Sequence, residues 1–598
     1  MSLLNVKNLN VEYEKRGIRV CAVRNLSLSL EKGDVVGIVG ESGSGKTSAM
    51  LALLGLLPDS AKITADEMEV DRRKLAMVFQ DPSAYLDDAM PVGQQITETI
   101  WAHRKCTRAQ AKEEAERLLD LVGIPQAARR MNQYPGALSG GMRQRVVIAI
   151  ALACEPEVLI ADEPTTALDV TVQSQILALI GRIAAETGTA VLLVSHDLGV
   201  IASLCHRVLV MKDGRLVEEG SVEDIFYDPK EAYTRELLKD ADYMYRMGKP
   251  MRRVTDKAGA EEKLLLELRN VTMSYERHKF LTKKRKTEEV KEVSFIIRKG
   301  ETFGLAGESG CGKTTLARLI TGLEKPVRGE ILYKGELLKP ISERTDRRES
   351  PIQMVFQNSY ASLNARMTAG EILEEMLILG GEKSKTERRR MVREALEMTG
   401  LCAEDTEKYP GEFSGGQRQR LCIARALIRK PELLILDEAL SGLDISIQVQ
   451  ILELLKKIQE ETKIAYLFIS HDLNTIRRMC ERTGIMYRGQ MVEEGDTTDI
   501  CREPWHPYTR ALLQSVPVPN PKKARRMKPV LWSEEERVHT EKRMDEGCPY
   551  WNRCGYRMER CGQNRISTYQ HGSRQIACFL YDPDDSGRSR DYEMTVQI

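Results

Sequence analysis

The sequence predicts an α/β fold that is built twice, as two tandem domains that each have a mainly parallel β-sheet core. Two observations predict it. A set of short motifs occurs twice, in the same order, along the 598 residues. Within each copy, apolar runs of strand length alternate with helical segments, and such alternation is typical of a parallel sheet that is covered by helices.

The repeat is long and keeps its register. GESGSGKTS, from Gly40, recurs as GESGCGKTT, from Gly307. VFQ, SGG, an apolar run that ends in Asp–Glu, and SHD follow in both copies. From Ser139 and Ser414 onward the spacing is identical. One domain has therefore been duplicated, and the second copy has a longer segment before VFQ, in which RGEILYKGELL predicts a β-hairpin.

The composition is that of an ordinary globular protein, with 42% hydrophobic and 30% charged residues. The formal net charge of +1 gives no reason to expect a nucleic-acid partner. No apolar run reaches the roughly 18 residues of a transmembrane helix, and the first residues lack the pattern of a signal peptide. We therefore expect a cytosolic chain that reaches a membrane only through partners.

Each copy places G-x-x-x-x-G-K-[ST] between an apolar strand and a helix. The backbone N–H groups of such a loop and the positive end of the helix bind phosphate. We expect Lys46 and Lys313 to reach the β- and γ-phosphates of ATP, and the hydroxyls of Thr47 and Thr314 to bind Mg²⁺. The other loop residues expected to bind the nucleotide are Gly40, Gly43, Gly45, Ser48, Gly307, Gly310, Gly312 and Thr315.

Two apolar strands end in acidic pairs, Asp162–Glu163 and Asp437–Glu438. Acidic pairs also occur in surface turns at strand ends, but the phosphate loop upstream favours a catalytic role. We expect each aspartate to hold Mg²⁺. Each glutamate is expected to orient and activate the attacking water, since phosphoryl transfer depends on positioning and charge neutralisation.

A histidine and a glutamine recur in register in each copy. His196 and His471 follow apolar strands, where a lone histidine is usually structural. Their recurrence favours a catalytic contact with the γ-phosphate. Gln80 and Gln357 end the VFQ motifs, and we expect them to touch the metal ion or the attacking water.

This ordered set of motifs resembles the ATP-binding cassette (ABC) family over almost all of residues 1–520. The resemblance implies two phosphate-loop ATPase domains, each with an antiparallel β part and a helical subdomain that carries the SGG signature. In the family this signature contacts the ATP held by the opposite domain, so the ATP sandwich would close within one chain. The signature residues are Ser139, Gly140, Gly141, Ser414, Gly415 and Gly416.

The resemblance extends to less specific positions. The loop after the acidic pair matches TALD, from Thr166, and SGLD, from Ser441. The aromatic residue that stacks on adenine in the family matches Tyr13 and Tyr275. None of the departures, such as Phe413 for the usual leucine of the signature, removes a catalytic group, so both sites are expected to hydrolyse ATP.

The ends of the two halves resemble the ATPases of oligopeptide, dipeptide and nickel importers, and HPYTRALL in the second half is especially typical. This resemblance implies two transmembrane permease subunits, an extracytoplasmic substrate-binding protein and a peripheral location on the cytoplasmic face of the membrane. Peptides, nickel and glutathione-like compounds are all moved by such motors, so the motifs leave the solute open.

Four cysteines lie in the tail: Cys548, Cys554, Cys561 and Cys578. Their spacing does not match the CxxC pairs of zinc ribbons. The tail resembles the family region in which four cysteines can hold a [4Fe–4S] cluster, and four thiolates are what such a cluster requires. Zinc and four unmetallated thiols are the alternatives.

The expected domains are a first nucleotide-binding domain (1–240), a polar linker (241–262), a second nucleotide-binding domain (263–520) and the cysteine-bearing extension (521–598). Two other functions are the alternatives. Tandem cassettes that act on ribosomes carry a long charged helical linker, and DNA-repair or chromosome ATPases carry large coiled-coil or zinc insertions. Neither feature is present in the sequence, which favours the importer.

Overall fold

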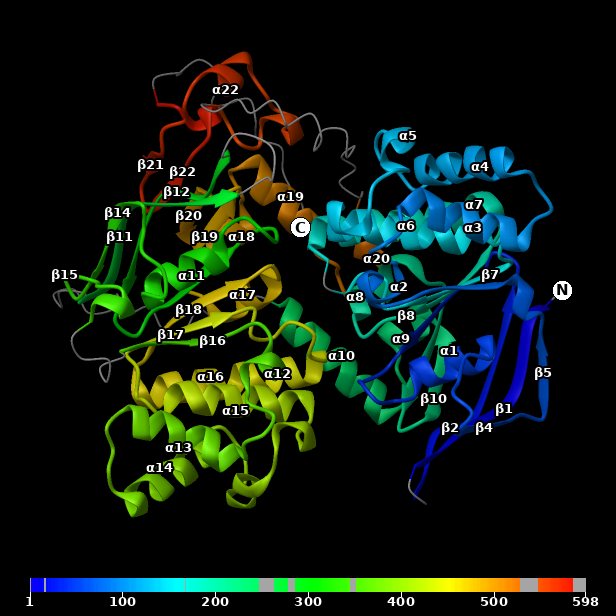
Figure 1. Cartoon of the computed structure of the whole chain (residues 1–598), viewed down its shortest axis with the longest axis horizontal. Coiled ribbons are helices and arrows are strands. Elements are labelled where there is room, and N and C mark those ends of the chain that lie inside the picture. Colours follow the sequence, from blue (N-terminus) through cyan, green and yellow to red (C-terminus); the bar gives the residue numbers. More distant parts are fainter. Residues whose placement is uncertain are drawn as a thin grey trace. The chain divides into compact units, whose positions relative to one another are not determined.

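The computed structural model describes residues 2–15, 18–166, 168–246, 263–277, 285–344, 351–527 and 547–583. They form two compact units, whose elements are labelled in Figure 1. The first unit comprises Met1–Tyr245, Asp444–Ser446 and the described part of Gln514–Arg543, and the second comprises the remainder. Within these ranges no helix is long and apolar enough to cross a membrane.

A six-stranded sheet forms the core of the first unit, in the order β10-β9-β3-β8-β7-β6. Its neighbours are parallel except for β10, which pairs antiparallel with β9. The central strands are wholly buried, as their continuous apolar sequences predict. The strands are β3 (Val35–Val39), β6 (Leu75–Val78), β7 (Val158–Asp162), β8 (Ala190–Val194), β9 (Arg207–Lys212) and β10 (Arg215–Ser221).

Helices complete the first unit. Apolar residues of α3, α4 and α6 share one hydrophobic core with the sheet, among them Ile96, Leu118 and Val146. The helices are α1 (Lys46–Leu54), α2 (Pro82–Tyr85), α3 (Val92–His103), α4 (Arg108–Leu121), α5 (Ala127–Arg130), α6 (Gly140–Ala153), α7 (Val170–Thr187), α8 (Leu198–Leu204), α9 (Val222–Tyr227) and α10 (Ala232–Tyr245).

An antiparallel sheet packs on the other side of α1 in the first unit. Long strands β1 (Ser2–Lys15) and β2 (Ile18–Glu31) pair along their length. AKITADEMEV, which is shorter than the hairpin segment of the second copy, forms β4 (Ala61–Thr64) and β5 (Glu67–Val70), and both pair with β1. Apolar side chains of β1, β2 and α1 form a second core, so α1 is held between two sheets.

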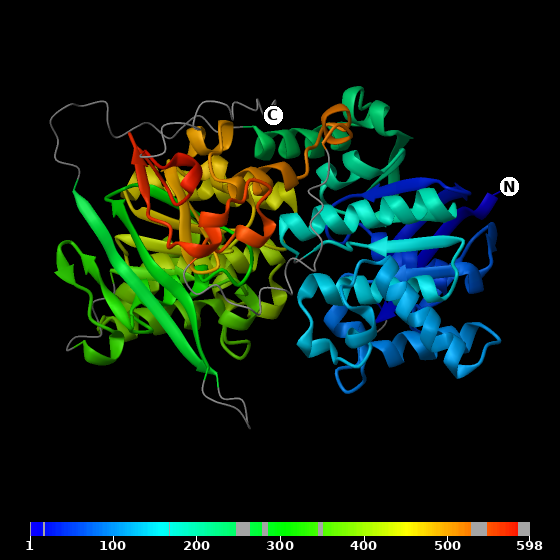
Figure 2. The same cartoon turned by 90° about the horizontal axis from the view of Figure 1, so that it is seen from above.

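The second unit repeats this plan, with an eight-stranded sheet in the order β16-β17-β18-β13-β19-β20-β22-β21. The predicted hairpin is confirmed as β14 and β15. Figure 2 shows the long strands β11 and β12 side by side, in green. The strands are β11 (Leu264–Arg277), β12 (Arg285–Arg298), β13 (Thr302–Ala306), β14 (Arg328–Tyr333), β15 (Glu336–Leu337), β16 (Ile352–Val355), β17 (Leu433–Asp437), β18 (Ala465–Ser470), β19 (Arg482–Tyr487) and β20 (Gln490–Asp496).

The helices of the second copy follow the order of the first. They are α11 (Lys313–Thr321), α12 (Ser359–Ser362), α13 (Ala369–Leu379), α14 (Lys385–Met398), α15 (Gly415–Leu427), α16 (Ile445–Thr462), α17 (Leu473–Met479), α18 (Thr497–Arg502) and α19 (Pro507–Ser515).

The extension that the sequence places at 521–598 is divided between the units. Its first part carries α20 (Pro521–Ala524), in the first unit, where Arg525 forms an ion pair with Glu223. Its cysteine-bearing part adds β21 (Tyr569–His571) and β22 (Arg574–Ile576) to the sheet of the second unit, with β22 antiparallel to β20. The expected linker at 241–262 begins within α10, and residues 247–262 lie outside the described ranges.

Candidate active site

The phosphate loops have the shape that their sequences predict. In the first unit the loop joins the buried strand β3 to α1, and the backbone of Gly45 there has a φ of 93°. A Cβ at Gly45 would collide with the carbonyl oxygen of Ala22. Gly312 has a φ of 101°, and its Cβ would collide with the carbonyl oxygen of Glu289. Only glycine fits at these positions. Each glycine is the left-handed residue that precedes its helix, and α1 and α11 begin at the lysine that follows.

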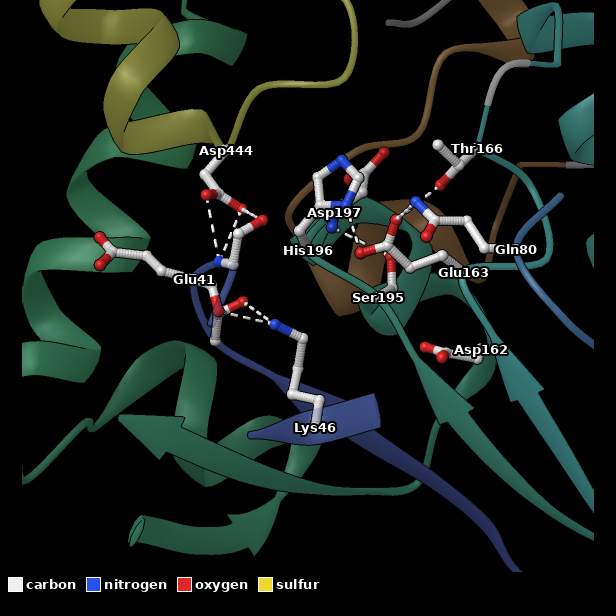
Figure 3. A network of polar contacts seen from close by, with 12 residues as sticks. Glu41, Lys46, Gln80, Asp162, Glu163, Thr166, Ser195, His196, Asp197 and Asp444 are labelled. Atoms are coloured by element: carbon white, nitrogen blue, oxygen red, sulfur yellow. Dashed lines mark hydrogen bonds and ion pairs between the residues drawn. The ribbon is translucent and has the colours of Figure 1, made fainter. Parts of the chain in front are cut away.

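Lys46 is buried within its own loop, as Figure 3 shows. Its ammonium group donates to the carbonyl oxygens of Gly40 (2.7 Å) and Glu41 (2.8 Å). Burial lowers the pKa of Lys46, and the nearby carboxylates, Glu163 first among them, partly oppose that shift. A buried ammonium that is held by carbonyl dipoles at a helix N-terminus provides positive charge where a phosphate would bind.

The carboxylate of Asp162, at the end of β7, accepts a hydrogen bond from the hydroxyl of Thr47 (2.9 Å). Burial raises the pKa of Asp162 above its ordinary value, and the Thr47 hydrogen bond opposes the rise. These two side chains supply hard oxygen donors of the kind that Mg²⁺ prefers.

Glu163 lies immediately after β7, in the left-handed backbone region, with a φ of 46°. One carboxylate oxygen accepts from the amide of Gln80 (2.8 Å) and the hydroxyl of Thr166 (2.9 Å). The other lies 3.0 Å from Nδ1 of His196. Left-handed conformations are uncommon outside glycine, and such residues are often found at functional sites.

The glutamate and histidine stabilise each other's charged forms. Burial is the largest influence and alone would raise the pKa of Glu163, but the hydrogen bond and charge of His196, together with Thr166 and Lys46, lower the pKa below its ordinary value. Burial is the largest influence and alone would lower the pKa of His196, but the hydrogen bond and charge of Glu163, together with the charges of Asp197 and Asp444, raise the pKa above its ordinary value. The site therefore favours an ionised carboxylate beside a protonated imidazole.

The second unit repeats most of this arrangement. Lys313 donates to the carbonyl oxygens of Gly307 (2.7 Å) and Glu308 (3.0 Å). Gln357 donates to Glu438 (2.6 Å), whose backbone φ is 48°, and Nδ1 of His471 lies 3.3 Å from the carboxylate of Glu438. Burial raises the pKa of Asp437, opposed by a hydrogen bond from Thr314. Burial is the largest influence on the pKa of Glu438 and would raise it, but His471 and the charge of Lys313 together lower the pKa below its ordinary value.

The signature residues cap helices in both units. The hydroxyl of Ser139 accepts from the backbone N–H of Met142 at the start of α6, and that of Ser414 accepts from the backbone N–H of Gln417 at the start of α15 (both 3.3 Å). Both serines are exposed, so the helix N-termini behind them face solvent.

Asp444, from the SGLD loop, belongs to the first unit. Its carboxylate accepts hydrogen bonds from the backbone N–H and the hydroxyl of Ser42 in the first phosphate loop, both at 3.0 Å (Figure 3). Sequence reasoning did not predict this contact. Nor do the motifs predict that Thr166 contacts Glu163, although Thr166 begins the TALD loop that follows the acidic pair.

The two tyrosines lie near the phosphate loops. The hydroxyl of Tyr13, on β1, donates to the hydroxyl of Ser48 (3.3 Å) on α1. Tyr275, on β11, donates to the carboxylate of Glu324, and burial raises the pKa of its hydroxyl to about 12. Adenine stacking remains a prediction for both.

The four tail cysteines line one pocket of the second unit, together with His506, Trp551 and other residues. Burial raises the pKa of Cys548 and of Cys578 to about 12. Across the described ranges, no group of three or more His, Cys, Asp or Glu side chains is placed to hold a single metal ion. The zinc alternative therefore gains no support from the geometry.

Two family models match the chain. The model described as "ABC transporter" matches residues 23–166 and 290–441. The model described as "Oligopeptide/dipeptide transporter, C-terminal region" matches residues 492–561, which include HPYTRALL and the first three tail cysteines.

The chain is similar to curated proteins over most of its length. It is 42% identical over 573 residues to "Glutathione import ATP-binding protein GsiA" of Escherichia coli O6:H1, covering 88% of this chain and 92% of that protein. It is 41% identical over 576 residues to the protein of the same name from Pectobacterium atrosepticum, covering 89% and 92%.

Among solved structures, the archaeal ribosome recycling factor aABCE1, in complex with the ribosomal stalk protein aP1, matches with a TM-score of 0.53 at 20% identity. The match covers 80% of this chain and 88% of that chain. At this identity the match supports the fold of two tandem cassettes and nothing about activity.

Proposed function

Because the chain belongs to the ABC transporter family and is the ATP-binding, ATP-hydrolysing subunit of an importer, we propose that it powers the uptake of a peptide-like solute such as glutathione. The observation that carries the solute class is the identity of about two residues in five, over 573 residues, to a glutathione import protein. The oligopeptide-type C-terminal region supports the same class.

We assign the chemistry of the first site to the network around Glu163. Thr47 and Asp162 would hold Mg²⁺, which when bound would neutralise charge on the phosphate oxygens. Glu163 orients the attacking water and accepts its proton, and the hydrogen bond from Gln80 helps to fix the direction of the carboxylate. His196, protonated beside Glu163, contacts the γ-phosphate as negative charge develops there.

The equivalent residues carry the second site. Lys313 would bind the β- and γ-phosphates, Thr314 and Asp437 would hold the metal ion, and Glu438 would activate the water. The Gln357–Glu438 hydrogen bond and the close approach of His471 to Glu438 repeat those of the first site, which supports hydrolysis at both. Both signatures begin at exposed, capped helix N-termini, which supports a sandwich in which each serine, Ser139 or Ser414, serves the ATP bound by the other cassette.

Importer ATPases of this family work with permease subunits, and we propose that two permeases dock beside the Gln80 and Gln357 loops. A short helix follows each glutamine, and each helix has an exposed tyrosine. These are Tyr85 on α2 (54% exposed) and Tyr360 on α12 (57% exposed). Exposed aromatic side chains are common anchors of protein interfaces. An extracytoplasmic binding protein would deliver the solute, and the chain would lie on the cytoplasmic face of the membrane.

Affinity purification of the tagged chain from detergent-solubilised cells tests the partners. Co-purification of two polytopic membrane proteins is the expected result, and the substitutions Tyr85→Ala and Tyr360→Ala should reduce their recovery. Lys74→Ala, at an exposed site in the first unit, is the matched control and should leave recovery unchanged. Recovery of ribosomes without any membrane protein would contradict the proposal.

We also propose that the tail cysteines bind a [4Fe–4S] cluster. The four thiols line one pocket, and four thiolates are what such a cluster requires. Purification without oxygen should give about four irons and four sulfides per chain, as the cluster's composition requires, together with a broad visible absorption. Cys554→Ser should remove the absorption. The control is Cys402→Ser, at an exposed cysteine shortly after α14, and it should leave the absorption unchanged. Iron-free protein from anaerobic cells would contradict the cluster.

A further inference from the structure

The cysteine-bearing tail contacts the second phosphate loop through one buried ion pair. Both terminal nitrogens of Arg553 donate to the carboxylate of Glu308, at 2.8 and 2.9 Å. The side chain of Arg553 is 3% exposed and that of Glu308 is 14% exposed. A bidentate pair of this kind fixes direction as well as distance, and burial protects it from screening by salt.

Glu308 is the residue of the phosphate loop through which the lysine is held. Its carbonyl oxygen accepts a hydrogen bond from the ammonium of Lys313. Its backbone N–H donates to the hydroxyl of Tyr508, on α19, at 2.9 Å. Three side chains therefore contact Glu308: Lys313 at its carbonyl, Tyr508 at its backbone N–H and Arg553 at its carboxylate.

Arg553 is itself fixed by the tail. It ends a short 3₁₀ turn, Trp551–Arg553, that lies between Cys548 and Cys554, two of the cysteines that line the pocket. Its guanidinium donates to the hydroxyl of Tyr487 (3.3 Å) and lies over the ring of Tyr550. A rearrangement of the pocket would therefore move the turn that presents Arg553 to the loop.

The first site lacks this contact and provides an internal comparison. Glu41, at the position of Glu308, donates its backbone N–H to Tyr233 (3.3 Å), and its carbonyl accepts from Lys46, as in the second copy. Among the described residues, however, no arginine pairs with the carboxylate of Glu41, and the ring of Tyr233 lies beneath Lys212 instead. Among the described residues, an arginine therefore pairs with the phosphate-loop glutamate at the second site and not at the first, and the tail supplies that arginine.

We propose that Arg553 is a positioning residue for the second ATP site, through which the state of the cysteine pocket sets the ATP affinity of that site and not of the first. The proposal rests on the proposed assignment of the phosphate loops as the two ATP sites. It does not depend on what the pocket binds.

The test measures binding of trinitrophenyl-ATP, without Mg²⁺, to the full chain with one site disabled. Lys46→Ala leaves the second site, and Lys313→Ala leaves the first. With the second site alone, Arg553→Gln should raise the Kd about tenfold, as expected for breaking a buried charge pair, and Arg553→Lys should recover part of the loss. With the first site alone, Arg553→Gln should change the Kd by less than about twofold.

Two controls separate positioning from general damage. Arg565→Gln removes a pair between the tail and Glu292 on β12, but both side chains are largely exposed, so the Kd of the second site should not change. Glu308→Gln breaks the buried pair from the other side. Because both substitutions remove the same interaction, the variant that carries both should lose less than the sum of the two effects.

The possible failures are distinct. Equal weakening at both sites, an unchanged Kd at the second site, or additive effects of Arg553→Gln and Glu308→Gln would overturn the positioning role. Retained binding in the variant with both lysines replaced would instead overturn the assignment of the ATP sites.

Discussion

Nδ1 of His196 lies 3.0 Å from a carboxylate oxygen of Glu163, and each residue favours the charged form of the other. The glutamate is held in the left-handed region immediately after a buried strand, so its carboxylate cannot follow the alternating direction of the strand's side chains. The second unit repeats this geometry at Glu438 and His471.

Replacing the proposed bases should separate binding from hydrolysis. Glu163→Gln keeps the size of the side chain but removes the acceptor for the proton of water, so the first site should slow roughly 10²- to 10⁴-fold. Glu438→Gln should do the same at the second site. Single-turnover ATP hydrolysis and ATP binding should be measured on each variant. Full hydrolysis by the protein that carries both changes would contradict the assignment.

The rate of the first site should fall as pH rises through the pKa of His196. That pKa lies above the ordinary value of about 6.5. The imidazolium is present below its folded-state pKa and is lost above it, so the decline should begin above pH 6.5. The measurement is the pH dependence of kcat in the Glu438→Gln background. In that background, His196→Gln should give a lower rate without this alkaline decline. If the decline had the same midpoint pH with and without His196→Gln, the role of the histidine would be refuted.

The signature serines should act across cassettes. Ser414→Arg would block the N-terminus of α15. Because the serine is exposed, the protein should lose only the contribution of the N-cap to its stability, about 1 kcal/mol. In the Glu438→Gln background, which leaves the first site active, Ser414→Arg should abolish hydrolysis. Ser139→Arg should be the harmful change in the Glu163→Gln background. If each substitution instead silenced the site of its own cassette, the sandwich would be wrong.

Much of the first site could be predicted from sequence because its residues lie at the ends of strands. The phosphate loop, the Asp162–Glu163 pair and His196 each follow an apolar run, and parallel strands end at one edge of the sheet. The order of motifs therefore predicted which side chains meet. The distances and the charged state of the Glu163–His196 pair depend on burial, which a motif does not specify.

The remaining features depend on contacts between distant parts of the chain. Arg553 and Glu308 are 245 residues apart, and nothing in CPYWNRC indicates which carboxylate its arginine will meet. AKITADEMEV is too short and too polar to predict two strands, and it forms them because both can pair with the long strand β1. The division of the extension between the units likewise follows from packing and not from composition.

The central claim is that ATP hydrolysis by this chain powers solute uptake. Its most direct test measures uptake of radiolabelled glutathione and of a labelled dipeptide by cells whose gene for this chain has been deleted. The wild-type chain should restore energy-dependent uptake of one of these solutes. The chain that carries both Glu163→Gln and Glu438→Gln should be produced to the same level and should recover the same membrane partners, yet should restore no uptake. Restoration of uptake by that variant to the wild-type rate would contradict the account, because transport would then not depend on ATP hydrolysis by these two sites.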